Sequence, residues 1–341
     1  MTDPFAVATA HVLQKASHGP MSKVLTLIGR RLAQLPVMIL GITFLVFFIM
    51  SFSRIDPAIT ALGEGASVEA RQAYREAHGL DDPLPQRYIA FLSGLARLDF
   101  GSYSARQLPV YDEVARAFPI TLQLTFLGLL FAVACSLALG VLAAIHRGRW
   151  PDQLIRLISI ASLSTPSFWL AILLIQLLGR KVGVISLLPT AGRLPALTDD
   201  PVGWFLRMLL PAVALAVPVI GQLSRVVRTS VVEELDRDYV RTALGAGIPR
   251  RVVVGRNVLR NALITPITVL GLRVGYLLGG AVIIEIIFTI NGMGMLILNG
   301  VTNNEPNLVQ GVTLTVAIAF VVINTIVDLL YVLVNPRIRT V

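Results

Sequence analysis

The sequence predicts an all-α integral membrane protein with six transmembrane helices and both termini on the cytoplasmic side. Three observations lead to this fold class. Of the 341 residues, 55% are hydrophobic and only 14% are charged, whereas charged residues make up about a quarter of an ordinary soluble domain. The mean hydropathy is correspondingly high, at +0.74. The apolar residues gather in six long runs, and the basic residues gather beside alternate ends of those runs.

The first predicted span is residues 33–52, which contain no charged residue. About 20 apolar residues at 1.5 Å each match a hydrocarbon core of about 30 Å. A secretory signal is the alternative, but the run is too long, starts too late and is followed by no small-x-small cleavage site. Residues 1–32 are expected to form a cytoplasmic tail, and residues 33–341 the membrane domain.

Five further runs are long enough to cross a bilayer. They are residues 119–145, 158–178, 208–224, 262–287 and 308–334. With the N-terminus inside, the inner segments hold 17 Lys and Arg in 88 residues, and the outer segments hold 11 in 115. Because basic residues concentrate in cytoplasmic loops, the inner side is predicted to be the cytoplasm.

The first outer segment, residues 53–118, is too long for a simple connection and carries 9 acidic and 7 basic residues. We expect it to fold against the membrane. Asp81 or Asp82 is predicted to cap an amphipathic helix that a proline begins, with Tyr88 and Phe91 on its apolar face. That face is expected to pack onto neighbouring helix ends, and a partner contact is the alternative.

Several spans contain polar residues that a simple anchor does not need. A charge at mid-span costs about 2.5–3.5 kcal/mol on insertion scales. The residues predicted to line a translocation path are Ser164, Thr165, Ser167, Gln222, Arg273 and Glu285. Hydroxyl groups in lipid also serve as helix-packing contacts, and Glu285 and Asp328 can instead extend toward the ends of their spans. Arg273 and Glu285 lie about 18 Å apart along an ideal helix, so they cannot pair.

A ridge of small residues runs along the fifth span. Gly271, Gly275 and Gly279 repeat every four residues, a spacing that lets another helix approach closely. The ridge is predicted to pack on a second membrane subunit or on this chain's own bundle. The single cysteine, Cys135, allows no intramolecular disulfide and is expected to be a packing residue.

The inner segment 225–261 contains the most strongly patterned stretch. Tyr239, Val240, Ala243 and Leu244 recur at helical spacing. Gly247 stands where a helix end requires a left-handed residue, and a proline two residues later can begin the next helix. The stretch therefore predicts a helix, a sharp turn and a second helix. Its mainly basic surface is suited to a docking partner or to acidic lipid.

Enzymatic and nucleic-acid functions find no support in the sequence. There is no P-loop, no His-Glu-x-x-His pattern and no ligand spacing among the four histidines, so we predict no metal site, no cofactor in this chain and no catalytic residue. The net charge of +9 does not indicate nucleic-acid binding, because the arginines are not interleaved with aromatic residues.

The stretch at 238–266 resembles the coupling loop of permease subunits from binding-protein-dependent ABC importers. That family's pattern is Glu-Ala-Ala, three residues, Gly, nine residues and Ile-x-Leu-Pro. Here Arg241-Thr242-Ala243 and Gly247 fill the first part, so an arginine replaces the acidic residue, and of the last part only Leu259 matches. These departures resemble the peptide and nickel branch, whose members end the stretch in RNAL, here residues 260–263.

Other passages resemble the same branch and occur in the same order. They are GLDDPLPQRY (79–88), LDFGSYS (98–104), TPSFWL (165–170), LLPTAG (187–192), LGGAVIIEIIF (278–288) and DLLYVLVNPRIR (328–339). The likeness extends from about residue 24 to the C-terminus. It implies a type I importer permease fold, in the first or B-type subunit of a dipeptide or oligopeptide importer of a prokaryotic inner membrane.

The resemblance also implies partners and roles. The partners are a second homologous permease subunit, two cytoplasmic ATP-binding subunits that bind ATP and Mg, an external substrate-binding protein, the peptide and membrane lipid. The permeases are expected to alternate access as the ATPases close. The implied coupling residues are Tyr239, Arg241, Thr242, Ala243, Gly247, Arg250 and Arg251. Alternatives are an ABC permease for nickel or glutathione, a secondary ion-coupled transporter, and a channel or assembly scaffold.

Overall fold

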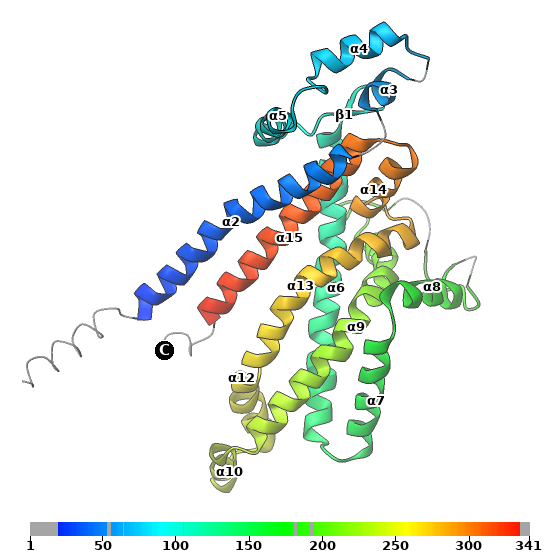
Figure 1. Cartoon of the computed structure of the whole chain (residues 1–341). Coiled ribbons are helices and arrows are strands. Elements are labelled where there is room, and N and C mark those ends of the chain that lie inside the picture. The colour runs from blue at the N-terminus through cyan, green and yellow to red at the C-terminus, as the bar shows by residue number, and fades with distance from the viewer. Residues whose placement is uncertain are drawn as a thin grey trace, which may run out of the picture.

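The computed structural model describes residues 20–52, 56–63, 65–104, 106–180, 183–190 and 194–334, and this part of the chain is almost wholly helical (Figure 1). Its long helices are α2 (Pro20–Ser51), α6 (Val110–Ile145), α9 (Pro201–Leu235), α13 (Ile264–Phe288) and α15 (Pro306–Val334). Each contains a stretch that is long and apolar enough to cross a membrane. The predicted all-α membrane architecture is thereby confirmed.

The remaining elements are short. They are α3 (Pro57–Leu62), α4 (Val68–Ala77), α5 (Leu84–Ala96), α7 (Trp150–Ser164), α8 (Ser167–Leu178), α10 (Asp238–Gly245), α11 (Arg250–Val252), the π-helix η1 (Val253–Val258), α12 (Leu259–Ala262), α14 (Met293–Thr302) and the two-residue strands β1 (Ser102–Tyr103) and β2 (Leu108–Pro109). The strands pair antiparallel as a hairpin.

The third predicted span is not a single straight helix. It divides into α7 and α8, which are bent by 106° at Thr165 and Pro166. Pro166 has no backbone N–H and its ring crowds the preceding turn, which favours a break or a kink in the helix at this point. Thr165 Oγ1 donates to the carbonyl of Ala161 at 2.8 Å, which satisfies one of the groups that the break exposes. Counted as one crossing, the bent pair completes six spans.

Several helices extend beyond the apolar runs that predicted them. α9 continues to Leu235, so residues 225–235, which were expected in a loop, prolong the fourth span. Its N-terminal end is capped by Asp200, whose Oδ1 accepts the N–H of Gly203 at 2.8 Å. α6 begins at Val110 and α2 at Pro20. Residues 1–19 of the predicted tail lie outside the described residues.

The centre of the bundle lies between α6, α9 and α13. Leu124, Leu215, Leu277 and Ile284 are completely buried there. A Cβ atom on Gly128 would lie 3.0 Å from Leu215, so the absence of a side chain lets α6 approach α9 closely. α2 and α15 lie side by side at the edge of the bundle (Figure 1). The scaffold thus consists of a tightly packed centre and a peripheral helix pair.

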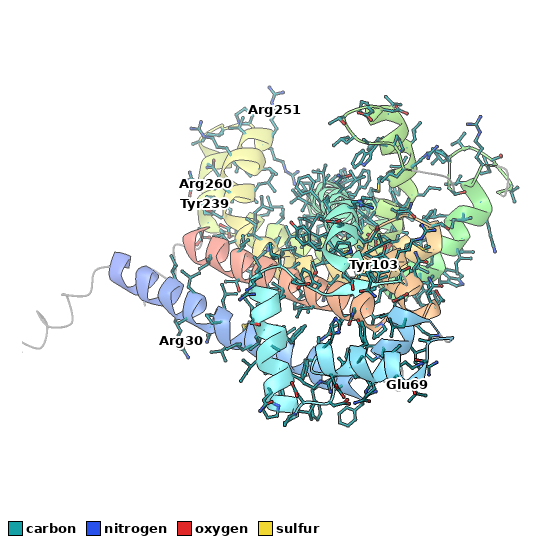
Figure 2. The ribbon with its side chains drawn as sticks, turned by 90° about the horizontal axis from the view of Figure 1, so that it is seen from above. Arg30, Glu69, Tyr103, Tyr239, Arg251 and Arg260 are labelled. Carbon is teal, nitrogen blue, oxygen red and sulfur yellow. The ribbon has the colours of Figure 1, made fainter. Side chains whose placement is uncertain are left out.

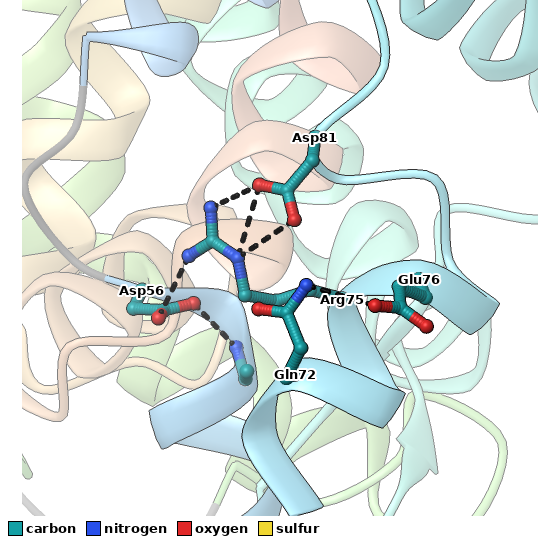
Figure 3. A network of polar contacts seen from close by, with 6 residues as sticks. Asp56, Gln72, Arg75, Glu76 and Asp81 are labelled. Carbon is teal, nitrogen blue, oxygen red and sulfur yellow. Dashed lines mark hydrogen bonds and ion pairs between the residues drawn. The ribbon is translucent and has the colours of Figure 1, made fainter. Parts of the chain in front are cut away.

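The outer segment gathers at one end of the bundle, where α3, α4, α5 and the hairpin lie together (Figure 1). Arg75 connects its parts (Figure 3). Its guanidinium binds Asp56 Oδ2 at 3.0 Å and also binds both carboxylate oxygens of Asp81. The Arg75 guanidinium holds the pKa of Asp81 below its usual range. One side chain on α4 therefore joins the start of α3 to the loop before α5.

The predicted aspartate cap of α5 is wrong, because Asp81 binds Arg75 and the residue before the helix is Pro83. The apolar face of α5 is confirmed. The rings of Tyr88 and Phe91 pack 5.3 and 5.5 Å from the ring of Phe47 on α2. The Tyr88 hydroxyl lies 2.9 Å from Thr43 Oγ1. The outer segment is thus anchored on a helix end of the same chain.

Candidate functional site

The predicted helix, turn and helix between the fourth and fifth spans are confirmed. α9 leads into α10, and a turn then leads through α11, η1 and α12 into α13. Figure 1 shows this segment at the end of the bundle opposite the outer segment. It is the part of the described chain in which most of the predicted coupling residues come together.

Gly247 forms the turn as predicted. Its φ angle is +81°, in the left-handed region. Its N–H donates to the carbonyl of Leu244 at 3.0 Å, and the N–H of Ile248 donates to the carbonyl of Ala243 at 3.2 Å. This pair of bonds is a Schellman motif, which ends a helix sharply. A Cβ atom on Gly247 would meet no atom within 4 Å, so the position requires glycine for its backbone conformation and not for space.

The inner face of the segment packs firmly on the bundle. Val240, Val253, Val258 and Ala262 are buried against residues of α6 and α9. Tyr239 and Ala243 pack against the same cluster. The Tyr239 hydroxyl donates to Glu234 Oε1 at 2.9 Å, and burial raises the pKa of Tyr239. Asn261 Nδ2 donates to the same carboxylate oxygen at 3.2 Å. α10 is therefore fixed to the end of α9 and to α12.

The outer face combines apolar and basic side chains. Leu244, Ile248 and Val252 are 41%, 40% and 42% exposed. Exposed arginines surround them, and Figure 2 shows Arg251 extending from this segment. We call this surface the tip; it consists of Arg241, Thr242, Leu244, Ile248, Arg250, Arg251 and Val252. Exposed apolar side chains among arginines are typical of a surface that another protein covers.

A cavity of about 420 Å³ lies behind the tip, between α10 and the connection from α6 to α7. Arg147 Nη1 donates to Asp236 Oδ2 across this region at 2.8 Å. Arg250 lines the cavity from the second helical piece. The ion pair provides a further connection between the base of α10 and the rest of the bundle.

An ion pair between α7 and α9 was not foreseen from the sequence. Arg228 Nε and Nη2 donate to the two oxygens of Asp152 at 2.5 and 2.7 Å, and the N–H of Gly148 donates to Asp152 at 2.9 Å. Asp152 is 1% exposed. Further along the same two helices, the hydroxyls of Ser159 and Ser224 lie 2.8 Å apart. Two polar contacts thus hold α7 on the part of α9 that leads to the tip.

The predicted path residues come from four helices. Ser164 is exposed at the bend, and Thr165 and Ser167 beside it are partly buried. Gln222 is partly buried on α9. Arg273 is partly buried on α13, with its guanidinium 6.0 Å from the ring of Tyr276, a distance at which the ring attracts a cation. Their role in a path stays a prediction.

Glu285 differs from the other predicted path residues. It is 0% exposed, so it does not extend toward the surface, and its Oε2 accepts the N–H of Gly294 at 2.7 Å. Gly294 is the second residue of α14. The side chain of Asp328 lies outside the described part of the chain.

The glycine ridge on α13 divides between two environments. A Cβ atom on Gly271 or Gly275 would come within 2.5 Å of Val327 or Phe320, so both glycines pack on α15 of this chain. Gly279 is exposed, and a Cβ atom there would meet nothing. Cys135 on α6 is exposed, so it is not packed within the described part of this chain, and its role as a packing residue stays a prediction. Among the described residues, no group of three His, Cys, Asp or Glu could hold a metal ion.

The end of the bundle that carries segment 53–118 (Figure 1) contains a second cavity, of about 460 Å³, between α6 and α14. Glu113 and Arg116 line it from α6 and form an ion pair at 2.9 Å. Asn291 and Asn299 line it from the turn before α14 and from α14 itself. The described chain therefore has polar cavities at both ends of the bundle.

Comparison with known proteins gives matches over almost the whole chain. Residues 136–340 match the family described as binding-protein-dependent transport system inner membrane component, and residues 24–125 match the N-terminal family of the same membrane components. A candidate peptide transport system permease protein of Brucella abortus is 37% identical over 314 residues, which cover 92% of this chain and 98% of the relative.

Two relatives from Escherichia coli K12 are similar to the same extent. A candidate D,D-dipeptide transport system permease protein is 35% identical over 333 residues, covering 92% of this chain and 97% of the relative. The glutathione transport system permease protein is 35% identical over 312 residues, covering 92% of this chain and 98% of the relative.

Proposed function

The chain belongs to the binding-protein-dependent transport system inner membrane components, and from this membership we propose that it is the permease through which an ABC importer carries dipeptides or oligopeptides across the membrane. It is a multi-pass inner membrane permease component of a peptide-type importer. Relatives named for peptide, D,D-dipeptide and glutathione transport support a peptide substrate.

We propose that the tip is the surface on which one cytoplasmic ATP-binding subunit docks. The observation that carries this role is the contrast between the inner and outer faces of the segment from α10 to α12. The inner face is fixed to α9 and α12 by Tyr239 and the buried valines, whereas the outer face leaves Leu244 and Ile248 uncovered. A rigid element with an exposed apolar end transmits a displacement when a partner holds that end. With six spans, a cytoplasmic tip predicts that both chain termini are also cytoplasmic.

In the proposed cycle, ATP binding draws the two ATP-binding subunits together, and the tip follows the subunit that holds it. Because α10 is fixed to the end of α9, the displacement reaches the centre of the bundle. This permease and a second, homologous one then rock between an outward-facing and an inward-facing state. An external binding protein delivers the peptide, and ATP and Mg are bound by the partner subunits.

Replacing Leu244 with aspartate tests the docking surface. We expect Leu244→Asp to reduce the amount of ATP-binding subunit that copurifies with the chain by roughly tenfold, because the interface would lose an apolar contact and would have to desolvate a carboxylate. The measurement is copurification from mild detergent, followed by peptide-stimulated ATP hydrolysis. Leu62→Asp is the matched control, since Leu62 is equally exposed, at 41%, but lies on α3 in the outer segment. Equal loss or equal retention in both variants would contradict the docking role.

Arg273 is proposed to lie in the path and to bind the carboxylate of the peptide. We expect Arg273→Gln to lower transport of peptides with a free C-terminal carboxylate by about tenfold, because the charge-assisted hydrogen bond between the guanidinium and that carboxylate is lost. Transport of the same peptides with an amidated C-terminus should change little. The measurement is uptake into proteoliposomes, with Arg97→Gln on the exposed end of α5 as the charge control. Normal transport of both peptides by Arg273→Gln would exclude the role.

A further inference from the structure

Two side chains from other helices hold the beginning of α14. The N–H of Gly294 donates to Glu285 Oε2 of α13 at 2.7 Å, and the N–H of Met293 donates to Thr121 Oγ1 of α6 at 2.9 Å. Glu285 and Thr121 are both 0% exposed. The residue that precedes α14 is Gly292, which has no side chain to cap the helix. α13 and α6 therefore supply the caps that α14 lacks.

The fit between α14 and its support is close. A Cβ atom on Gly292 would collide with the Glu285 carboxylate, and one on Gly294 would collide with the carbonyl of Val282 on α13. Met293 is completely buried between them. The beginning of α14 thus lies directly on the backbone of α13.

The Glu285 carboxylate is only partly satisfied in this arrangement. Its Oε1 is buried and has no hydrogen-bond partner among the described residues. A buried oxygen without a donor destabilises the state that contains it. Movement of α14 away from α13 would let water donate a hydrogen bond to this oxygen. The cost of the unpaired oxygen therefore lowers the free energy that holds α14 in place. Such a contact suits an element that must be released as well as held.

The position of α14 makes its release relevant to transport. Asn291, Met295 and Asn299 from the turn and helix face Glu113 and Arg116 of α6 across the outer cavity of about 460 Å³. α14 also joins α13 to α15, both of which are long helices of the bundle. A displacement of α14 therefore changes one wall of the cavity at the outer end.

We propose that Glu285 and Thr121 form a releasable latch that holds α14 as the closed outer wall of the bundle. The proposal rests on the alternating-access function above, because the latch opens when the bundle rocks. Glu285 is a positioning residue here: it fixes α14 and does not bind the peptide. A static cap is the competing explanation, and it differs by staying closed in every state of the transport cycle.

The reporter for the latch is a cysteine at Met293 in a Cys135→Ser background, labelled by a membrane-impermeant maleimide in the complete transporter. Because residue 293 is completely buried, labelling should be slow without nucleotide. We expect Thr121→Val and Glu285→Ala to increase its rate about tenfold. Thr121→Ser and Glu285→Gln should restore slow labelling, since each keeps an oxygen that accepts the N–H of α14.

Thr125→Val is the matched control. Thr125 is also buried on α6, one turn from Thr121, but its hydroxyl donates to the carbonyl of Thr121 within its own helix. The control should label as slowly as the parent. If it labels as fast as Thr121→Val, the rate reports loosening of α6 and the latch is overturned.

Trapping the transporter with ATP and orthovanadate distinguishes a latch from a static cap. We expect the trapped parent to label about tenfold faster than the nucleotide-free parent. Unchanged labelling on trapping, in a complex that hydrolyses ATP on peptide addition, would overturn release. The labelling of the nucleotide-free variants reports the contacts of α14 with α6 and α13, whereas copurification reports docking of the ATP-binding subunit. Failure of the latch and failure of the proposed function therefore give different results.

Discussion

Replacing Gly247 with valine is expected to lower peptide-stimulated ATP hydrolysis and transport by at least about tenfold while leaving the transmembrane bundle folded. Gly247 has a φ angle of +81°, a conformation that costs a residue with a side chain about 1–2 kcal/mol and more when the side chain is β-branched. A Cβ atom there meets no neighbour, so the effect acts only through the backbone. Relaxation of the turn would displace Ile248 and separate the tip from its support.

Two variants make this result interpretable. Gly247→Asn should retain most of the coupling, because asparagine tolerates the left-handed region. Gly245→Ala should behave as the parent, since Gly245 lies in the last turn of α10 without a positive φ and with open space around it. The measurement is ATP hydrolysis with and without peptide in the reconstituted transporter. If peptide stimulates ATP hydrolysis in Gly247→Val as strongly as in the parent, the turn does not transmit force.

Replacing Arg228 with methionine is expected to have the largest effect on stability, a loss of about 3–5 kcal/mol, because the Asp152 carboxylate would stay buried without its cation. Asp152 is 1% exposed and Arg228 21% exposed, so solvent screens this pair only weakly. The measurement is thermal unfolding in detergent, together with the yield of monodisperse protein. Arg225→Met is the control, because Arg225 lies one turn earlier on α9 and is exposed.

The double variant separates loss of the pair from loss of an arginine. Replacing both partners, as in Asp152→Asn with Arg228→Met, should recover much of the stability lost in the single variant, since no buried charge is left unpaired. If the double variant is as unstable as the sum of the two single variants, the two residues do not interact across α7 and α9 and the bidentate contact is not the source of the effect.

The features that could be predicted from the sequence are those that depend on residues close together along the chain. The turn at Gly247 was predictable because a left-handed helix end favours glycine through its own backbone sterics. The apolar face of α5 was predictable because Tyr88 and Phe91 lie three residues apart on one side of a helix. The break at Pro166 was visible as a missing backbone donor, but the 106° bend was not, because neighbouring helices determine the direction in which a broken helix continues.

Length, hydropathy and local backbone chemistry therefore established from the chain alone that it is a helical membrane protein of about six spans with a sharp turn between the fourth and fifth. Tertiary packing decided which polar residues meet. Asp152 and Arg228 lie 76 residues apart, Asp81 binds Arg75 instead of capping α5, and Glu285 holds α14. Such pairs leave no periodic pattern in the sequence, because the free energy of a buried charge depends on the partner that folding brings to it and not on its neighbours in sequence.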